Sequence, residues 1–354
     1  MTWECPHRRV EVDNTTYGGG RPSMGSVAET AAVDQGSGGD ILSDRTAAGR
    51  ERPWREKKLA AQKVAAAYSA LGEARKAARC RDCGTRLVFD ECPIDQHKRL
   101  KAANFCRGRL CPMCAWRRSM RWSAAASVVL HAAADQHPEW GYVLLTLTQR
   151  NVHGALLPVE IGRILASWDK LRRRRELGAV AGWLRTLEVT RNERTWEWHP
   201  HIHALLAVTP EYFRGRGYVS HARWVALWRE VMGLDYDPSV DVHRVRARLA
   251  GDPLDAAARE VGKYTVKDGD LVGDGQDTIS RVAVLDAALR GRRLIEWGGS
   301  LRQLARRLRQ DVPEGEEDLV HITGEDHGPA CPVCGTEMLP HVYRWIESVR
   351  QYVG

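Results

Sequence analysis

The stretch WEWHPHIHALLAV, residues 196–208, carries a histidine at every second position and apolar side chains between and after them. Successive side chains of a β-strand point to opposite faces, so His199, His201 and His203 share one face of the predicted strand. The even positions of residues 202–208 lie on the other face, which we expect to be buried core. Imidazoles that share a face converge above the sheet, and neutral histidine is a common ligand of divalent metals. The strand therefore predicts a metal site on one side and core on the other.

A second strand precedes the histidine strand and is expected to pair with it. GWLRTLEVTR, residues 182–191, is separated from it by a short polar turn near residues 192–195, which is typical of a hairpin. Pairing across this hairpin places Glu188 opposite the segment between His199 and His203, on the same face. Histidines with a carboxylate suit Mg²⁺ or Mn²⁺ and leave positions for phosphate oxygens and water. The alternative for Glu188, which the sequence leaves open, is an exposed strand carboxylate.

The surrounding segment alternates strands and helices. Strands are expected at residues 141–149, 182–191, 197–208 and 238–245, and helices are expected to begin near Pro158, Ser220 and Pro253. The last helix is expected to end near Asp268. The resulting order, βαββαβα, predicts an α+β fold with a largely antiparallel sheet and helices on one face.

The last of these helices carries a possible catalytic stripe. Glu260, Tyr264 and Lys267 stand at i, i+4 and i+7, which places them on one face of a helix. A tyrosine hydroxyl can attack a phosphodiester, a lysine can stabilise the developing charge, and a carboxylate can activate a second nucleophile. Taken alone, the spacing favours a plainer interpretation, in which Tyr264 packs in the core and the charges form a helical salt bridge.

Three separate motifs together resemble those of one protein family. YVLLTLTQRN, HPHIHALL and EVGKYTVKD follow one another at suitable distances, and they closely resemble the motifs of rolling-circle plasmid replication initiators of the HUH endonuclease superfamily. The match is to the branch with one catalytic tyrosine, and NFCRGRLCPMCAWRRS upstream resembles that branch too. The resemblance covers roughly residues 80–270 and implies the HUH endonuclease fold.

The resemblance also implies roles for individual residues. His201 and His203 would be the paired metal ligands, and Tyr264 would attack the scissile phosphate of single-stranded or hairpin origin DNA. The products would be a 5′-phosphotyrosyl link and a free 3′-hydroxyl from which a polymerase extends. Glu260 would aid the later closing step, and Lys267 matches the family's lysine. Plasmid origin DNA and a host helicase and polymerase are the implied partners.

Nine cysteines include three C-x₂-C pairs, which in a cytoplasmic chain indicate zinc ligands rather than disulfides. Cys80, Cys83, Cys111 and Cys114 are expected to form a structural, zinc-ribbon-like site, although Cys92 or Cys106 could substitute. Free structural cysteines are the alternative. The zinc would hold a basic module against origin duplex, with these arginines nearby: Arg107, Arg109, Arg117, Arg118 and Arg121.

The third pair, Cys331 and Cys334, resembles another zinc knuckle. Its partners remain open among four residues: His327, His341, Cys92 and Cys106.

Charge and composition fit this interpretation. The formal charge of +8 favours a polyanionic partner such as nucleic acid. No apolar run approaches the roughly 20 residues that span a bilayer, and the N-terminus lacks the apolar core of a secretory signal, so we expect a cytoplasmic protein without membrane contact. The expected divisions are a disordered tail at 1–52, a basic helix and Cys-rich zinc-binding, DNA-contacting module at 53–122, a catalytic domain at 123–292, and a basic helix, acidic linker and CPVC tail at 293–354.

Other functions remain as alternatives. A relaxase or transposase of the same superfamily would use the same histidine pair and tyrosine. A nucleotide hydrolase of the histidine-triad kind is disfavoured by Pro200 and by the basic charge, and it would not need Tyr264. A non-catalytic zinc-ribbon DNA-binding protein would retain its activity without the tyrosine hydroxyl.

Overall fold

The computed structural model describes residues 39–46, 48–215, 217–246, 252–262, 266–322 and 328–354. Its helices are α1 (Trp54–Ala70), α2 (Ala74–Asp82), α3 (Pro112–Gln136), α4 (Leu157–Leu171), α5 (His221–Met232), α6 (Pro253–Val261), α7 (Asp268–Leu271), α8 (Gly275–Leu289) and α9 (Gly299–Arg307). Its strands are β1 (Arg86–Glu91), β2 (Lys98–Ala103), β3 (Gly141–Leu147), β4 (Val180–Arg191), β5 (Trp198–Val208), β6 (Val240–Arg244), β7 (Ile295–Gly298), β8 (Leu339–Ile346) and β9 (Gln351–Val353). The expected βαββαβα order is confirmed from β3 to α6.

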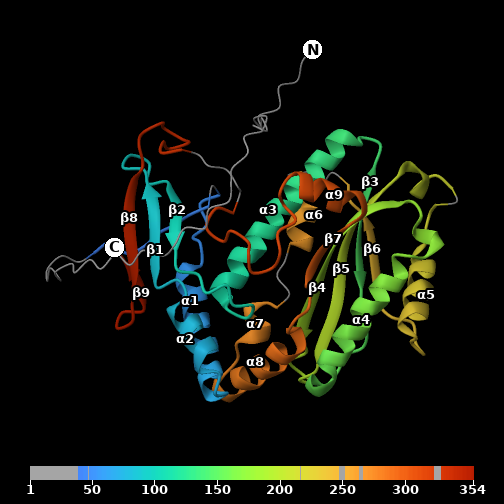
Figure 1. Ribbon diagram of the computed structural model, residues 1–354, viewed down its shortest axis with the longest axis horizontal. Helices are drawn as coiled ribbons and strands as arrows, with labels where there is room; N and C mark the ends of the chain where they lie inside the picture. Colours follow the sequence, from blue (N-terminus) through green and yellow to red (C-terminus); the bar gives the residue numbers. More distant parts are fainter. Residues whose placement is uncertain (1–38, 47, 216, 247–251, 263–265, 323–327) are drawn as a thin grey trace, which may run out of the picture. The chain divides into compact units, whose positions relative to one another are not determined.

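The histidine strand lies at the centre of a five-stranded antiparallel sheet. The strand order is β6-β3-β5-β4-β7, so β5 is hydrogen-bonded to β3 on one side and to β4 on the other (Figure 1). The register pairs Glu188 with His201, inside the interval predicted from the hairpin. Ile202, Ala204 and Val208 are fully buried, as expected for the apolar face of a central strand.

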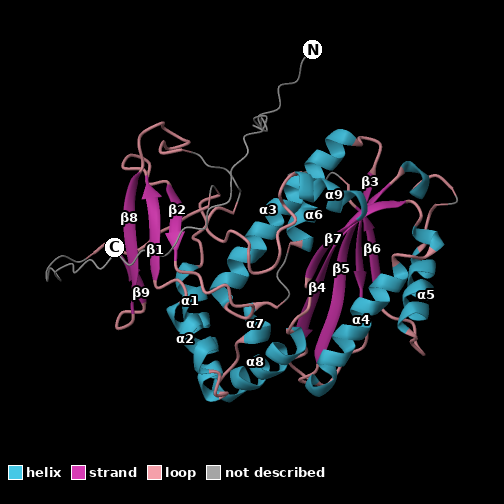
Figure 2. Cartoon of the chain, in the orientation of Figure 1, coloured by secondary structure: helices cyan, strands magenta, loops and turns pink. Residues whose placement is uncertain are grey.

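Helices pack on both faces of this sheet (Figure 2). On one face, Trp168 of α4 meets Trp183 of β4 with ring centroids 5.2 Å apart. On the other face, Thr186 Oγ1 donates a hydrogen bond of 2.5 Å to the carbonyl oxygen of Val261 in α6. The predicted α+β class and antiparallel sheet are thus confirmed, and α6, with α3 packed against it, adds a second helical layer to the single layer that we expected.

Capping residues set the limits of α5 and α6. The side chain of Ser220 accepts a hydrogen bond from the backbone N–H of Arg223, and the Asp252 carboxylate accepts from the N–H groups of Leu254 and Asp255.

The α6 helix ends at Val261, earlier than the predicted end near Asp268. Gly262 follows it, and a Cβ at this glycine would lie 2.7 Å from the backbone nitrogen of Ser123 in α3. The close approach to α3 requires glycine, which also favours helix termination. Lys267 consequently lies outside α6, directly before α7, so Lys267 and Glu260 do not share one helix.

A second antiparallel sheet has the order β2-β1-β8-β9 and joins segments far apart in the chain. Phe89 of β1 packs edge-on against Trp54 of α1 and Tyr343 of β8, with centroids 5.7 and 6.0 Å apart. The C-terminal strands β8 and β9 therefore complete a sheet that also contains β1 and β2. The domain divisions expected from the sequence stay a prediction. Within the described residues, no helix has the length and apolar character needed to cross a membrane.

Candidate active site

Three potential metal ligands gather on the central strands of the five-stranded sheet. His203 Nε2 lies 2.9 Å from Glu188 Oε2, and His201 Nε2 lies 3.5 Å from the same oxygen. One ligand atom from each of the three residues lies within 4.8 Å of the others. Two imidazoles and a carboxylate that converge in this way match the ligand set of a borderline or hard divalent cation.

Hydrogen bonds on the far side of each ring orient the two histidines. His201 Nδ1 lies 3.1 Å from the backbone carbonyl of His199, and His203 Nδ1 lies 3.1 Å from Thr146 Oγ1. A carbonyl oxygen can only accept, so His201 Nδ1 donates and the neutral ring keeps a lone pair on Nε2. That lone pair faces the Glu188 carboxylate, and a cation between the two acceptors would make the contact favourable.

Glu188 is almost fully buried, with 3% of its surface exposed. Burial acts to raise the pKa of its carboxyl, but the neighbouring side chains of His201, His203 and Lys267 hold that pKa well below its usual range. Lys267 Nζ lies 2.6 Å from Glu188 Oε1, and the pKa of this lysine is raised chiefly by its hydrogen bond to Glu188. Glu188 is therefore ionised near neutral pH, with one oxygen toward the histidines and the other toward Lys267.

The predicted catalytic residues beyond this cluster have different placements. Tyr264 lies outside the described residues. Glu260 lines a cavity of about 360 Å³ together with His203, Thr146 and Asp241, so it faces the same cavity as one of the three converging ligands. His199 lies beside His201 with ring centroids 5.1 Å apart but is not among the three converging ligands, and burial is the main cause that lowers its pKa.

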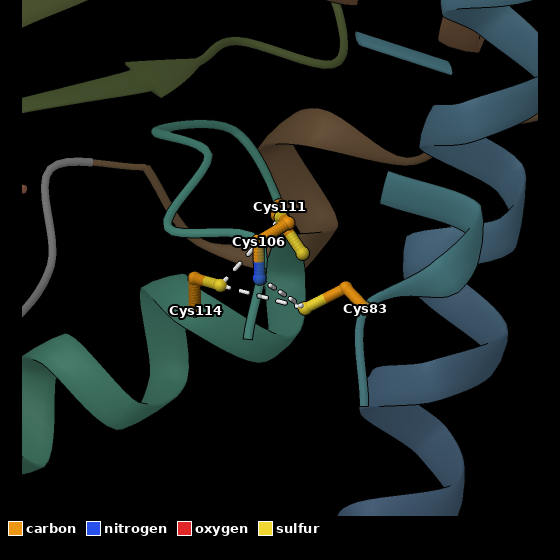
Figure 3. Close-up of side chains that lie close together, drawn as sticks. All are labelled: Cys83, Cys106, Cys111 and Cys114. Carbon is orange, nitrogen blue, oxygen red and sulfur yellow. Dashed lines mark hydrogen bonds between the residues drawn. The ribbon is translucent and has the colours of Figure 1, made fainter. Parts of the chain in front are cut away.

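A separate cluster brings together four cysteines near the start of α3 (Figure 3). Cys83 Sγ lies 3.5 Å and Cys106 Sγ lies 3.7 Å from Cys114 Sγ, and Cys111 completes the group. The backbone N–H groups of Cys106 and Arg107 donate to Cys83 Sγ and Cys114 Sγ, which favours thiolates. A zinc tetrahedron with Zn–S bonds of about 2.3 Å has its sulfurs about 3.8 Å apart, so these residues fit zinc.

The structure brings together three of the four cysteines that we predicted as a set. Cys106, the named substitute, stands in the cluster, whereas Cys80 Sγ contacts the carbonyl oxygen of Ala61 at 3.4 Å. The fully buried Lys58 donates to the carbonyl oxygens of Arg81 and Cys83 at 2.5 and 2.8 Å and brings positive charge beside the thiols. Sequence patterns did not point to this lysine, because its place depends on packing between α1 and α2.

Two of the arginines expected to face duplex DNA are buried instead. Arg117 and Arg118 are 4% and 1% exposed. Arg117 donates to the carbonyl oxygens of Leu319 and Val320, and Arg118 Nε lies 3.1 Å from the Glu317 carboxylate. The expectation that Arg117 and Arg118 face DNA was wrong, because both side chains bind residues 317–320 and hold that segment against α3.

Residues 97–353 match the family model described as "Replication protein". The chain belongs to the replication protein family. "Protein rep" of Bacillus amyloliquefaciens is 38% identical over 309 residues, which cover 81% of this chain and 90% of the relative. "Protein rep" of Lactiplantibacillus plantarum is 37% identical, with 81% of this chain and 92% of the relative covered. No solved structure matches the chain.

Membership of the replication protein family confirms the resemblance that the three motifs indicated. The matched range contains the Glu188–His201–His203 cluster, Glu260, Tyr264 and Lys267. Their individual roles are taken up as a proposal below.

Proposed function

We propose that this replication protein initiates plasmid replication by cutting one strand of origin DNA with Tyr264 as the nucleophile. The observation that carries the proposal is the convergence of Glu188, His201 and His203 on the sheet, with Lys267 in contact with Glu188 and Glu260 lining a cavity that His203 also lines. Such a constellation suits reaction at a phosphodiester, because it combines ligands for a cation, a fixed positive charge and a carboxylate.

The proposed reaction is a transesterification. The Tyr264 oxygen forms a bond to the scissile phosphorus, and the bond from phosphorus to the 3′-oxygen breaks. The tyrosine loses its proton, and the departing 3′-oxygen gains one. The phosphate keeps its bond to the 5′-oxygen of the DNA and thereby joins that 5′ end to Tyr264. The reaction conserves the energy of the phosphodiester, so that the free 3′-hydroxyl can prime synthesis and the strand can later be closed.

The converging residues would hold Mg²⁺ or Mn²⁺. His201 and His203 would supply Nε2, and Glu188 would supply the oxygen that lies 3.5 and 2.9 Å from these atoms. When bound, the cation would withdraw charge from the scissile phosphate. Lys267 keeps Glu188 ionised through the second carboxylate oxygen and therefore acts as a positioning residue.

Glu260 and the cysteine cluster have supporting roles in this proposal. Glu260 would accept a proton in the closing step, when a second nucleophile attacks the phosphotyrosine. Cys83, Cys106, Cys111 and Cys114 would hold structural Zn²⁺ and fix the start of α3, which packs on α6. Origin DNA is the proposed substrate, and a host polymerase and helicase are the proposed partners that use the free 3′-hydroxyl and separate the strands.

The test is incubation of purified protein with Mn²⁺ and supercoiled DNA that carries its origin. Wild type should open the supercoil and form a covalent protein–DNA adduct. Tyr264→Phe should form no adduct, whereas Tyr218→Phe, which changes an exposed tyrosine, should behave as wild type. An adduct that persists in Tyr264→Phe would place the nucleophile elsewhere. Sequence-specific binding without any adduct would favour the non-catalytic DNA-binding alternative.

A further inference from the structure

Two turns far apart in the chain have the same backbone hydrogen bonds. In the turn at residues 92–97, the N–H of Cys92 donates to His97 O at 2.9 Å, and the N–H of Gln96 donates to Cys92 O at 3.1 Å. In the turn at residues 331–336, the N–H of Cys331 donates to Thr336 O at 2.8 Å, and the N–H of Gly335 donates to Cys331 O at 2.9 Å. Both turns therefore follow one pattern.

The sequences of the two turns correspond position by position. Each begins Cys-Pro, CPIDQH in the first and CPVCGT in the second. Each has its fifth residue in the left-handed region, Gln96 with φ 55° and Gly335 with φ 73°. The fourth position is Asp95 in the first turn and Cys334 in the second, and carboxylate oxygen and thiolate sulfur are both zinc ligands.

The β-sheet places these turns next to each other. The first turn joins β1 to β2, and the second precedes β8, which pairs with β1 from Glu91 opposite Leu339 onward. Both turns therefore lie at the same end of the β2-β1-β8 part of the sheet. Three antiparallel strands with two such turns at one end have the form of a zinc ribbon.

The side chains of the first and fourth positions converge. Cys92 Sγ lies 3.4 Å from Cys334 Sγ, and Cys331 Sγ lies 3.2 Å from Asp95 Oδ2. One ligand atom from each of the four residues lies within 4.8 Å of the others. Cys92 and Cys331 are 2% and 3% exposed and pack with Met338 in a small core separate from the main one.

We propose that Cys92, Asp95, Cys331 and Cys334 bind a zinc ion that closes a ribbon built from the β1–β2 hairpin and the C-terminal strand β8. Three thiolates and one carboxylate complete a four-coordinate structural site. Because the ligands are 242 positions apart at their widest, between Cys92 and Cys334, the ion fastens the C-terminal strands to the β1–β2 hairpin. This site is distinct from the cluster at Cys83, Cys106, Cys111 and Cys114, and it does not depend on the proposed nuclease chemistry.

The experiment measures zinc per chain by native mass spectrometry on the full-length protein prepared under reducing conditions. Cys331→Ser/Cys334→Ser should carry one zinc fewer than wild type. Asp95→Asn should hold the same zinc more weakly and lose it at a lower chelator concentration. Val333→Ala, which changes a 73% exposed side chain in the same turn, should match wild type. The paired variant Cys83→Ser/Cys106→Ser should keep the zinc of the ribbon.

A second measurement remains decisive if the double serine variant does not fold. Co²⁺ bound to Asp95→Cys should show a stronger thiolate-to-metal charge-transfer band than Co²⁺ bound to wild type, because the site gains a fourth thiolate. Amide hydrogen exchange in β8 should also become faster when zinc is removed. An unchanged zinc count in Cys331→Ser/Cys334→Ser would overturn the proposal. A Cys92–Cys334 disulfide found by alkylation and mass measurement in the isolated protein would overturn it as well.

Discussion

Glu188 links the two histidines to Lys267, and its charge is central to the proposed site. Glu188→Gln keeps the size of the side chain but removes the negative charge that faces His201 and His203. We expect Mn²⁺-dependent nicking to fall by at least about tenfold, by analogy with losses in metal sites that lose a supporting group. Nicking rates measured over a range of Mn²⁺ concentrations check this. Glu193→Gln, in the exposed turn between β4 and β5, should nick at the wild-type rate; an equal loss in both variants would contradict a special role for Glu188.

Strand alternation made this part of the site predictable. Which face a side chain takes is a local property with a period of two, so Glu188 could be placed beside His201 from the hairpin alone. The contact of Lys267 with Glu188 was not predictable in this form, because it depends on the end of α6 at Val261 rather than on helical spacing.

The choice between Cys80 and Cys106 offers a second test at the residue scale. Cys106 Sγ lies 3.7 Å from Cys114 Sγ, whereas Cys80 Sγ contacts the Ala61 carbonyl. Cys106→Ser should therefore release zinc at a lower chelator concentration than wild type, and Cys80→Ser should retain it, since a hydroxyl can also donate to that carbonyl. Zinc release followed with a colorimetric chelator distinguishes the two. If Cys80→Ser released zinc at a lower chelator concentration and Cys106→Ser did not, Cys80 would be a zinc ligand in place of Cys106.

Among the contacts between elements, that of β4 with β7 requires glycine at position 298. A Cβ at Gly298 would lie 2.0 Å from the Trp183 ring, which is itself packed against Trp168 of α4. Gly298→Ala should lower the free energy of unfolding by about 1–3 kcal/mol, the usual cost of overpacking. Urea denaturation measures the difference. Gly275→Ala at the first position of α8, where no atom lies within 4 Å of the added carbon, is the control and should be neutral.

The end of α6 at Val261 was not predictable from the local sequence, which favoured a helix that continues to Asp268. Periodicity continued through residue 267, and the sequence alone favoured one long helix. The helix ends at Val261, where Gly262 approaches Ser123 of α3 closely, and a tertiary contact of this kind has no signature in local spacing. Caps at Ser220 and Asp252 were predictable because a capping side chain bonds to the next few backbone N–H groups.

At the scale of the whole molecule, a buried ion pair fastens the C-terminal segment to α3. Arg118 and Glu317 have side chains only 2% exposed and lie 3.1 Å apart. Glu317→Ala should destabilise the protein by about 3–5 kcal/mol, because it leaves the buried Arg118 charge without its carboxylate. Thermal and urea unfolding check the value. Glu316→Ala, at the exposed neighbouring position, should change stability little, and an equal effect of both substitutions would contradict the account.

The order of elements from β3 to α6 was easier to predict from the sequence than the sheet that joins β1 and β2 with β8 and β9. The elements from β3 to α6 follow the expected order because each has its own local periodicity, and α5 and α6 also have capping side chains. Pairing of β1 with β8 joins residues 248 to 258 positions apart, from Glu91 with Leu339 to Arg86 with Arg344, and no local pattern specifies such a partner. The Cys-Pro turns at Cys92 and Cys331 were the one sequence feature common to both segments, and their significance emerged only from the sheet register.

In the proposed reaction, Tyr264 becomes linked to the 5′ end of nicked origin DNA. The most direct measurement is digestion of the Mn²⁺-dependent adduct with nuclease and protease, followed by mass spectrometry of the peptide that retains a nucleotide. We expect a single modified peptide that contains residues 260–267, with the phosphate on Tyr264. A nucleotide on any other residue, or an origin that is cut without a covalent adduct, would contradict it.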